Sequence, residues 1–118
     1  MKLNSTLQLK VLENTYTVEF PDNGQYLRIQ NMKIVISPAY DSLRSVGDQG
    51  GYAELLTDME AHFSVLCPDL IKSLGKPIPK LSMTEGRELV KAYTEQFEPW
   101  YQEQLGIVFE VNKEVDKS

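Results

Sequence analysis

The chain has one cysteine and one histidine, and this shortage excludes several kinds of site. Cys67 alone allows no disulfide within the chain and supplies only one thiolate to a metal ion. No apolar run approaches the ~20 residues that a helix needs to cross a bilayer. We therefore expect a protein of a reducing compartment, with no membrane partner, no bound metal and no cofactor.

Basic residues are also scarce, because 12 Lys and Arg stand against 17 Asp and Glu. The net charge of −5 repels a phosphate backbone, so we expect no nucleic-acid partner. Lys72, Lys76 and Lys80 come nearest to a basic cluster, and a solvated loop accounts for them. The N-terminus lacks the apolar run and the small-residue cleavage site of a secretory signal, which indicates cytoplasmic assembly.

The chain is long enough for one hydrophobic core, so we predict a single domain over residues 1–118. Apolar and polar residues alternate in two runs, 7–11 and 16–20, with a turn at 13–15 between them. A period of two predicts a β-hairpin within residues 1–21. An isolated hairpin is marginally stable in water, so its apolar face must pack against a helix or against another chain.

The segment over residues 23–36 has two readings. An Asn-Gly pair at its start is a common hairpin-turn signal and would introduce a third strand. Tyr26, Ile29 and Ile36 instead fall at helical spacing, with an Asp or Asn ahead of them to cap the helix. We prefer the helix. A polar connection with three glycines follows at 38–51, and we predict a mobile loop that changes state on assembly.

Two longer helices are predicted from apolar stripes of helical period. The first spans residues 52–66, and one or two further turns follow it before Gly75. The second begins at a capping box, Ser82 with Glu85, and extends to about Gly106. The expected fold class is therefore α+β and mostly helical, with the hairpin packed against about three α-helices.

The C-terminal part is expected to differ from the helices before it. Residues 107–111 fit one short strand. This strand would be the last element of the mostly helical part, which spans residues 22–111. Residues 112–118 carry too little apolar surface to fold alone, so we predict a charged tail.

A nucleophilic catalytic site could be formed by three residues near one another in sequence, Asp58, His62 and Cys67. Five residues of helix rotate by about 500°, so His62 and Cys67 would lie roughly 140° apart on the helix. Pairs of glutamates three residues apart, at 85 and 88 and at 95 and 98, are common on solvated helix faces. We therefore predict no catalytic residue and no metal ligand, and a partly buried or interfacial His62.

The aromatic residues around Pro99 are the strongest candidates for partner binding. A proline inside a helix costs about 3 kcal/mol, so we expect a kink that turns the following residues away from the core. Trp100 should then be partly exposed in the isolated chain and buried on assembly, although the core is the other reading of these aromatics. The residues assigned to partner binding are Phe97, Pro99, Trp100, Tyr101, Tyr52 and His62.

The order of these pieces resembles small proteins encoded among bacteriophage structural genes, and tail assembly chaperones in particular. The resemblance rests on four stretches: Val18-Glu19-Phe20-Pro21, Gly24-Gln25, Phe63-Ser64-Val65-Leu66-Cys67-Pro68-Asp69-Leu70 and Pro99-Trp100-Tyr101. It implies a non-enzymatic protein that coats the tape measure protein in the host cytoplasm before the tail tube polymerises. The alternative is a minor structural virion subunit, a capsid, connector or tail component held by contacts between subunits. Phage structural proteins are the expected partners, and a homo-oligomer is compatible with either reading.

Overall fold

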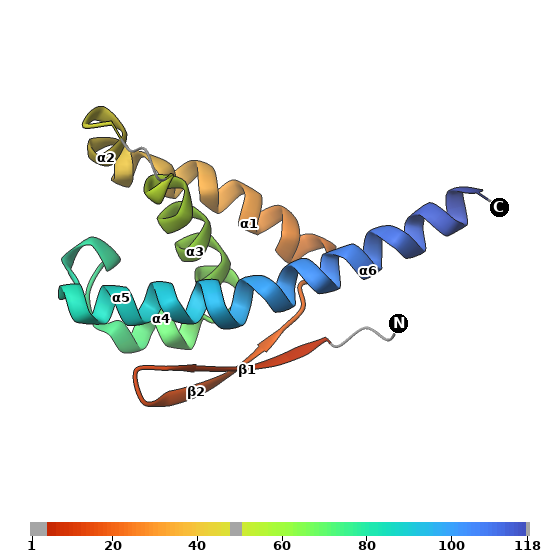
Figure 1. Ribbon diagram of the computed structural model, residues 1–118, viewed down its shortest axis with the longest axis horizontal. Helices are drawn as coiled ribbons and strands as arrows, with labels where there is room; N and C mark the ends of the chain where they lie inside the picture. The colour runs from red at the N-terminus through yellow and green to blue at the C-terminus, as the bar shows by residue number, and fades with distance from the viewer. Residues whose placement is uncertain (1–4, 48–50, 118) are drawn as a thin grey trace.

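A two-stranded hairpin lies against a set of helices in the computed structural model, which describes residues 5–47 and 51–117. The longest helical stretch runs along the length of the molecule (Figure 1). This arrangement confirms the prediction of an α+β fold that is mostly helical.

The hairpin consists of β1 (Thr6–Val11) and β2 (Asn14–Glu19), which pair antiparallel. Leu12 and Glu13 form the turn between them and both have positive φ, at 50° and 68°. Two central residues with positive φ match the right-handed twist of the strands in a tight hairpin. The predicted turn at 13–15 was therefore too long and began one residue too late.

Helices and helical turns make up most of the remaining described chain. In order, they are α1 (Asn23–Ile36), η1 (Ser37–Tyr40), α2 (Asp41–Ser45), α3 (Tyr52–Leu66), α4 (Pro68–Leu74), η2 (Ile78–Lys80), α5 (Met83–Ala92), η3 (Tyr93–Phe97) and α6 (Glu98–Lys117). Residues 23–36 are thus a helix, as preferred from the sequence, and no third strand is found in the described part of the chain.

Capping boxes fix the start of two helices. At α1, the Asp22 carboxylate accepts the Gln25 N–H at 2.7 Å, and the Gln25 side-chain oxygen accepts the Asp22 N–H at 3.0 Å. At α5, Ser82 and Glu85 make the corresponding pair at 3.1 and 3.3 Å, as predicted. Each box satisfies two backbone donors that have no partner within the helix.

Most of the predicted loop at 38–51 forms η1 and α2 instead, while residues 48–50 lie outside the described residues. Arg44 links this segment to α3 through a carboxylate oxygen of Glu54 at 2.7 Å. The same guanidinium binds Asp41 at 2.6 Å and the Ser37 carbonyl at 2.9 Å. These contacts of Arg44, with the buried Tyr40 of η1, join to α3 a stretch whose composition indicated a loop.

Pro99 does not turn the chain away from the core, and α5, η3 and α6 follow one another as one long helix (Figure 1). The segment η3 is π-helical, and the Glu98 N–H donates to the Tyr93 carbonyl five residues back. The wider turn accommodates the proline ring, which clashes with the preceding turn in a regular α-helix. The predicted kink was wrong for this reason.

The chain beyond Gly106 is also helical, so the predicted strand at 107–111 was wrong. A strand there would lack a neighbour to satisfy its backbone groups, whereas a continued helix satisfies them internally. The predicted charged tail is likewise part of α6 as far as Lys117.

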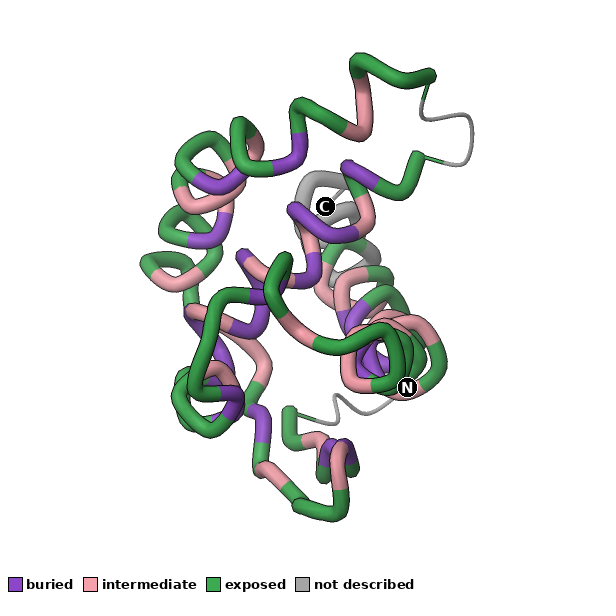
Figure 2. Tube along the Cα trace, turned by 90° about the vertical axis from the view of Figure 1, so that its left-hand side faces the viewer, coloured by how far each residue is buried: buried purple, intermediate pink, exposed green. Residues whose placement is uncertain are grey.

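One core joins the hairpin to the helices. Its largest fully buried side chains include Leu9 of β1, Ile29 of α1, Met59 and Phe63 of α3, and Phe97 of η3. Figure 2 shows buried positions recurring along the helices, next to exposed ones. Within residues 5–47 and 51–117, no helix combines the length and the apolar content that a membrane crossing requires.

Candidate functional site

Four of the six residues predicted to bind a partner lie in the core instead. Phe97, Trp100, Tyr101 and His62 expose 0%, 7%, 3% and 6% of their surface. Because η3 accommodates Pro99, the apolar stripe of the long helix keeps facing inward, and Phe20 packs against Trp100 with ring centroids 6.0 Å apart. The prediction that Trp100 is partly exposed in the isolated chain was therefore wrong.

His62 is enclosed by this aromatic cluster. Its ring centroid lies 4.9 Å from that of Tyr101 and 5.3 Å from that of Phe97. Burial lowers the pKa of His62, which favours the neutral ring. The expectation of a partly buried or interfacial histidine understated how far the ring is buried.

The three residues weighed as a nucleophilic site do not form a relay. The Nδ1 atom of His62 lies 2.7 Å from the backbone carbonyl oxygen of Asp58, whereas the Asp58 carboxylate pairs with Lys33 at 3.6 Å. Burial raises the pKa of the Cys67 thiol, which disfavours the thiolate that a nucleophile requires. No group of three or more His, Cys, Asp or Glu residues suited to a metal ion is found among the described residues.

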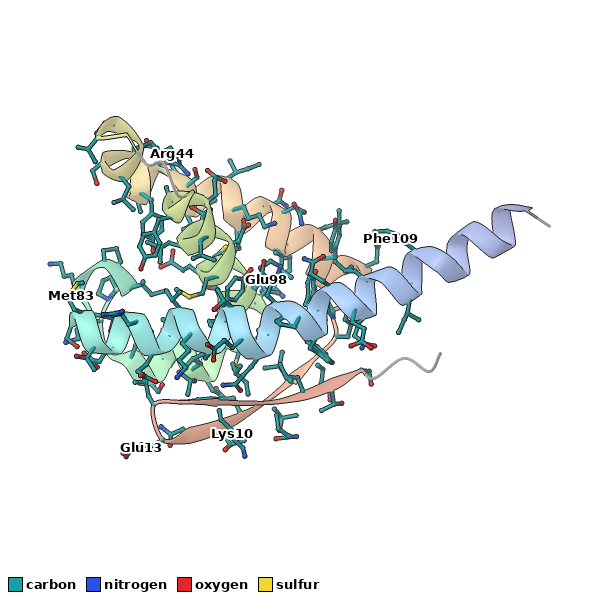
Figure 3. All side chains as sticks on the ribbon, viewed as in Figure 1. Lys10, Glu13, Arg44, Met83, Glu98 and Phe109 are labelled. Atoms are coloured by element: carbon teal, nitrogen blue, oxygen red, sulfur yellow. The ribbon has the colours of Figure 1, made fainter. Side chains whose placement is uncertain are left out.

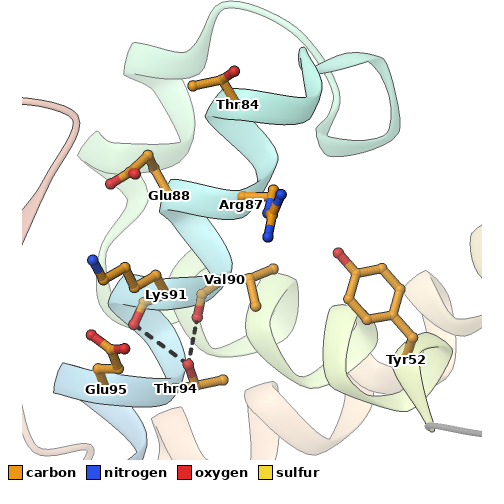
Figure 4. A pocket seen from close by; sticks show the side chains of 8 residues that line it. All are labelled: Tyr52, Thr84, Arg87, Glu88, Val90, Lys91, Thr94 and Glu95. Carbon is orange, nitrogen blue, oxygen red and sulfur yellow. Dashed lines mark hydrogen bonds between the residues drawn. The ribbon is translucent and has the colours of Figure 1, made fainter.

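The other two predicted residues remain accessible. Pro99 is exposed, and Tyr52 exposes 43% of its surface at the start of α3. Tyr52 faces Arg87 of α5 across an open cleft of about 640 Å³ (Figure 4). Glu88 and Lys91 lie close together on the α5 side, so charges of both signs line the cleft and favour no single class of ligand.

The structure places a different apolar surface in solvent, on the side of α1 that faces away from α3. Leu27, Ile34 and Val35 expose 55%, 74% and 73% of their surfaces. Asn31 and Arg28 are exposed on the same side, whereas Ile29 and Ile36 are buried on the opposite side. We call Leu27, Arg28, Asn31, Ile34 and Val35 the outer α1 face.

A second apolar feature lies where α1 begins beside α6. A notch of about 300 Å³ is lined there by Phe20, Pro21, Asp22, Asn23, Tyr26, Leu105, Val108 and Phe109. Tyr26 and Phe109 expose 37% and 57% of their surfaces at its rim. Figure 3 shows Phe109 on α6 close to the start of α1. We call this the α1–α6 notch.

The outer α1 face carries one charged side chain, the cation Arg28, although the chain is acidic overall. Residues 23–40 contain two charged side chains, Arg28 and Lys33, and no acid. Lys33 is paired with Asp58, and no ion pair of Arg28 is found in the described part of the structure. An acidic group that docked on this face would find an available cation in Arg28.

Sequence reasoning missed the outer α1 face because it followed only one stripe of this helix. The helical spacing of Tyr26, Ile29 and Ile36 predicted the helix, and the structure buries Ile29 and Ile36 while Tyr26 is 37% exposed. A second signal was present in Leu27 and Ile34, which are seven residues apart and therefore share one side of a helix. Apolar residues on both sides of a helix at the surface of a small domain indicate that one side contacts another molecule.

Comparison of the chain with known protein families, with curated proteins and with solved structures finds no match.

Proposed function

We propose that this protein is a non-enzymatic binding protein of the tail-assembly-chaperone kind, which covers an apolar helix of a structural client protein. The observation that carries the proposal is the outer α1 face, where three aliphatic side chains lie in solvent on one side of a packed helix. Amphipathic helices commonly bind such a face through side chains one turn and two turns apart. The resemblance to tail assembly chaperones supplies the class of client, a phage structural protein assembled in the host cytoplasm.

The geometry suits a binding face that exists before the client arrives. The inner side of α1 packs on α3 through Ile29 and Ile36, and the Asp22–Gln25 capping box fixes its first turn. A helix anchored in this way presents Leu27 and Ile34 without refolding, so little ordering has to accompany binding.

Co-expression with the long helical tail protein of the same assembly pathway tests the proposal. The wild-type chain should co-purify with that client, and the variant with Leu27→Gln and Ile34→Gln should not. Val46→Gln is the matched control, because Val46 is 80% exposed and lies outside the outer α1 face. A wild-type chain that stays free of the client at every concentration would contradict the proposal.

The open edge of the hairpin favours a second candidate function, that of a minor structural virion subunit. The Phe20 N–H donates to the Ser5 carbonyl at 2.7 Å. In an antiparallel pair, every second residue of a strand points its backbone groups at the other strand, so this bond fixes which residues of β2 face β1. The backbone groups of Thr15, Thr17 and Glu19 then point away from β1, as a strand added from a neighbouring subunit would require. Mass spectrometry of purified particles separates the candidates, because a subunit is present in fixed copy number and a chaperone is absent.

A further inference from the structure

The two edges of the hairpin differ in how their backbone groups are satisfied. In β1, the backbone groups of Lys10 point away from β2, and Gln96 binds both of them, at 2.8 and 2.7 Å. In β2, the outward residues are Thr15, Thr17 and Glu19, and no hydrogen bond to their outward backbone groups is found within the described residues. The edge of β1 is therefore covered at one position, whereas three successive outward positions of β2 are open.

A groove adjoins the open edge of β2. Its volume is about 320 Å³, and it lies between β2 and the junction of α3 with α4. Its lining residues are Thr15, Tyr16 and Thr17 on the β2 side, and Leu66, Cys67, Pro68 and Asp69 at the junction. The Tyr16 hydroxyl lies 3.0 Å from the Ser73 hydroxyl of α4, which joins the strand to the helix. Both sides of the groove are thus held together before any partner arrives.

We propose that the edge of β2 binds an extended segment of a partner protein, which adds a third strand to the hairpin beside the α3–α4 junction. Antiparallel pairing is the more stable arrangement per residue. Thr15, Thr17 and Glu19 would then each exchange two hydrogen bonds with the residue opposite. Five residues of the added strand, about 17 Å long, span these three positions.

The side chains of the added strand would alternate between two environments. Those opposite Thr15, Thr17 and Glu19 lie on the solvated face of the hairpin, where all three residues are exposed. Glu19 has no ion pair within the described part of the chain, so a lysine or arginine opposite it makes a favourable cross-strand pair. The intervening side chains face the groove, which is apolar at Leu66 and Pro68. The fitting segment therefore combines a basic residue with apolar residues at alternate positions.

A second copy of this chain, added through pairing of β2 with β2, is the competing occupant. The helices lie on one side of the hairpin (Figure 1), and Thr6, Gln8 and Lys10 are exposed on its other face. Antiparallel pairing about a two-fold axis keeps the covered faces of both hairpins on the same side. The α3–α4 junction of the second copy would then meet the junction that already lines the groove. An extended segment without helices over it avoids this overlap.

This inference rests on the second candidate function, and it names the kind of segment by which a neighbouring subunit makes contact. Binding of a peptide to the isolated chain tests the inference, whereas the composition of purified particles tests the subunit role. The two can therefore fail separately. The outer α1 face shares no residue with β2, so client binding is tested separately as well.

Peptide selection on the full-length chain tests the inference. A display library of random peptides of about nine residues, enough to span the open edge, is selected on the wild type and then depleted on Thr17→Pro. Proline removes the outward N–H of residue 17 and leaves the ladder to β1 intact. Thr17→Val is the matched control, because it keeps that N–H and also loses the bond from the Thr17 hydroxyl to Gln8.

We expect selected peptides with a basic residue and alternating apolar residues. They should bind Thr17→Pro at least ~10-fold more weakly than the wild type, and Thr17→Val within about twofold. Circular dichroism checks that Thr17→Pro keeps its fold. N-methylation of the peptide at the residue opposite Thr17 removes the complementary donor without changing the chain, and it should weaken binding by about the same factor.

Nuclear magnetic resonance of the labelled chain locates the bound peptide. The amide protons of Thr15, Thr17 and Glu19 should exchange with solvent more slowly in the complex, while those of Leu27 and Ile34 on α1 should not change. A selection that yields no peptide dependent on the Thr17 N–H would overturn the inference. A chain whose mass doubles with rising concentration, and stays that of one copy in Thr17→Pro, would also overturn it, since a second copy would then occupy the edge.

Discussion

Gln96 binds the backbone of Lys10 with both ends of its side-chain amide. The Lys10 N–H donates to Oε1 at 2.8 Å, and Nε2 donates to the Lys10 carbonyl at 2.7 Å. This pair reproduces the hydrogen bonds of a neighbouring strand and covers the outward edge of β1 at that residue. Because Gln96 lies in η3, it also joins the hairpin to the long helix next to Pro99.

Replacing Gln96 with leucine should lower the free energy of unfolding by about 1–3 kcal/mol, because two hydrogen bonds are lost while the side-chain volume is kept. Urea denaturation followed by circular dichroism measures this change. Gln102→Leu is the control, because Gln102 is exposed on α6. Equal stability of the two variants would show that the amide does not hold the hairpin in place.

Trp100→Ala should destabilise the fold by about 3–5 kcal/mol, because it removes a large ring from a closed cluster. That loss is a large fraction of the 5–15 kcal/mol typical of small domains, so the melting temperature should fall steeply. Met83→Ala is the control, since Met83 is 81% exposed. A Trp100→Ala variant that melts like the wild type would place this ring outside the core.

Tyr101→Phe should stabilise the protein by about 1 kcal/mol or more. The Tyr101 hydroxyl is buried and has no hydrogen-bond partner among the described residues, and burial raises the pKa of Tyr101 to about 12. Removing an unsatisfied buried hydroxyl relieves its desolvation penalty. The melting temperature should rise for Tyr101→Phe. It should not rise for Tyr93→Phe, because the Tyr93 hydroxyl lies within hydrogen-bond distance of Nδ1 of His62, at 3.3 Å. A lower melting temperature for Tyr101→Phe would contradict this account.

Stability should fall in acid because of His62. Burial lowers the pKa of His62 in the folded state below the ordinary 6.5, so the unfolded chain binds more protons below that pH. The free energy of unfolding therefore decreases as pH falls through about 6.5 towards the lower folded pKa. Burial raises the pKa of Glu60, which acts in the opposite direction in acid.

Comparing the stability of the wild type with that of His62→Gln at each pH separates the contribution of His62 from that of Glu60, which both proteins contain. The difference in urea midpoint between wild type and variant should shrink as pH falls from about 8 to 5, because only the wild type carries the cost of protonating a buried ring. A difference that stays constant over this range would show that His62 titrates as it does in the unfolded chain.

The elements predicted correctly from the sequence are those marked by a strong local pattern of residues. The Ser82–Glu85 capping box and the apolar stripe of residues 52–66 act within a few turns of helix, and the structure confirms both. Pro99 was misread because its effect depends on η3, a one-residue widening of the helix that no short pattern indicates. The strand predicted for residues 107–111 was wrong because the backbone there is satisfied within a continuing helix.

The candidate site was harder to predict than the fold. Aromatic residues suit both a core and an interface, so the sequence left Trp100 and Tyr101 open, and burial then decided for the core. Leu27 and Ile34 were identifiable as one side of a helix. Whether that side packed inward depended on where α3 lies, which the sequence does not reveal.

The affinity of a folded variant for the client tests most directly whether the outer α1 face is the client-binding surface. Isothermal titration of the purified client protein measures its affinity for three proteins. They are the wild type, the variant with Leu27→Gln and Ile34→Gln, and Val46→Gln, which changes a comparably exposed position. We predict at least ~100-fold weaker binding for the α1 variant, from the loss of two aliphatic anchors, and unchanged binding for Val46→Gln. Equal affinity of all three proteins, with unchanged melting temperatures, would contradict the account.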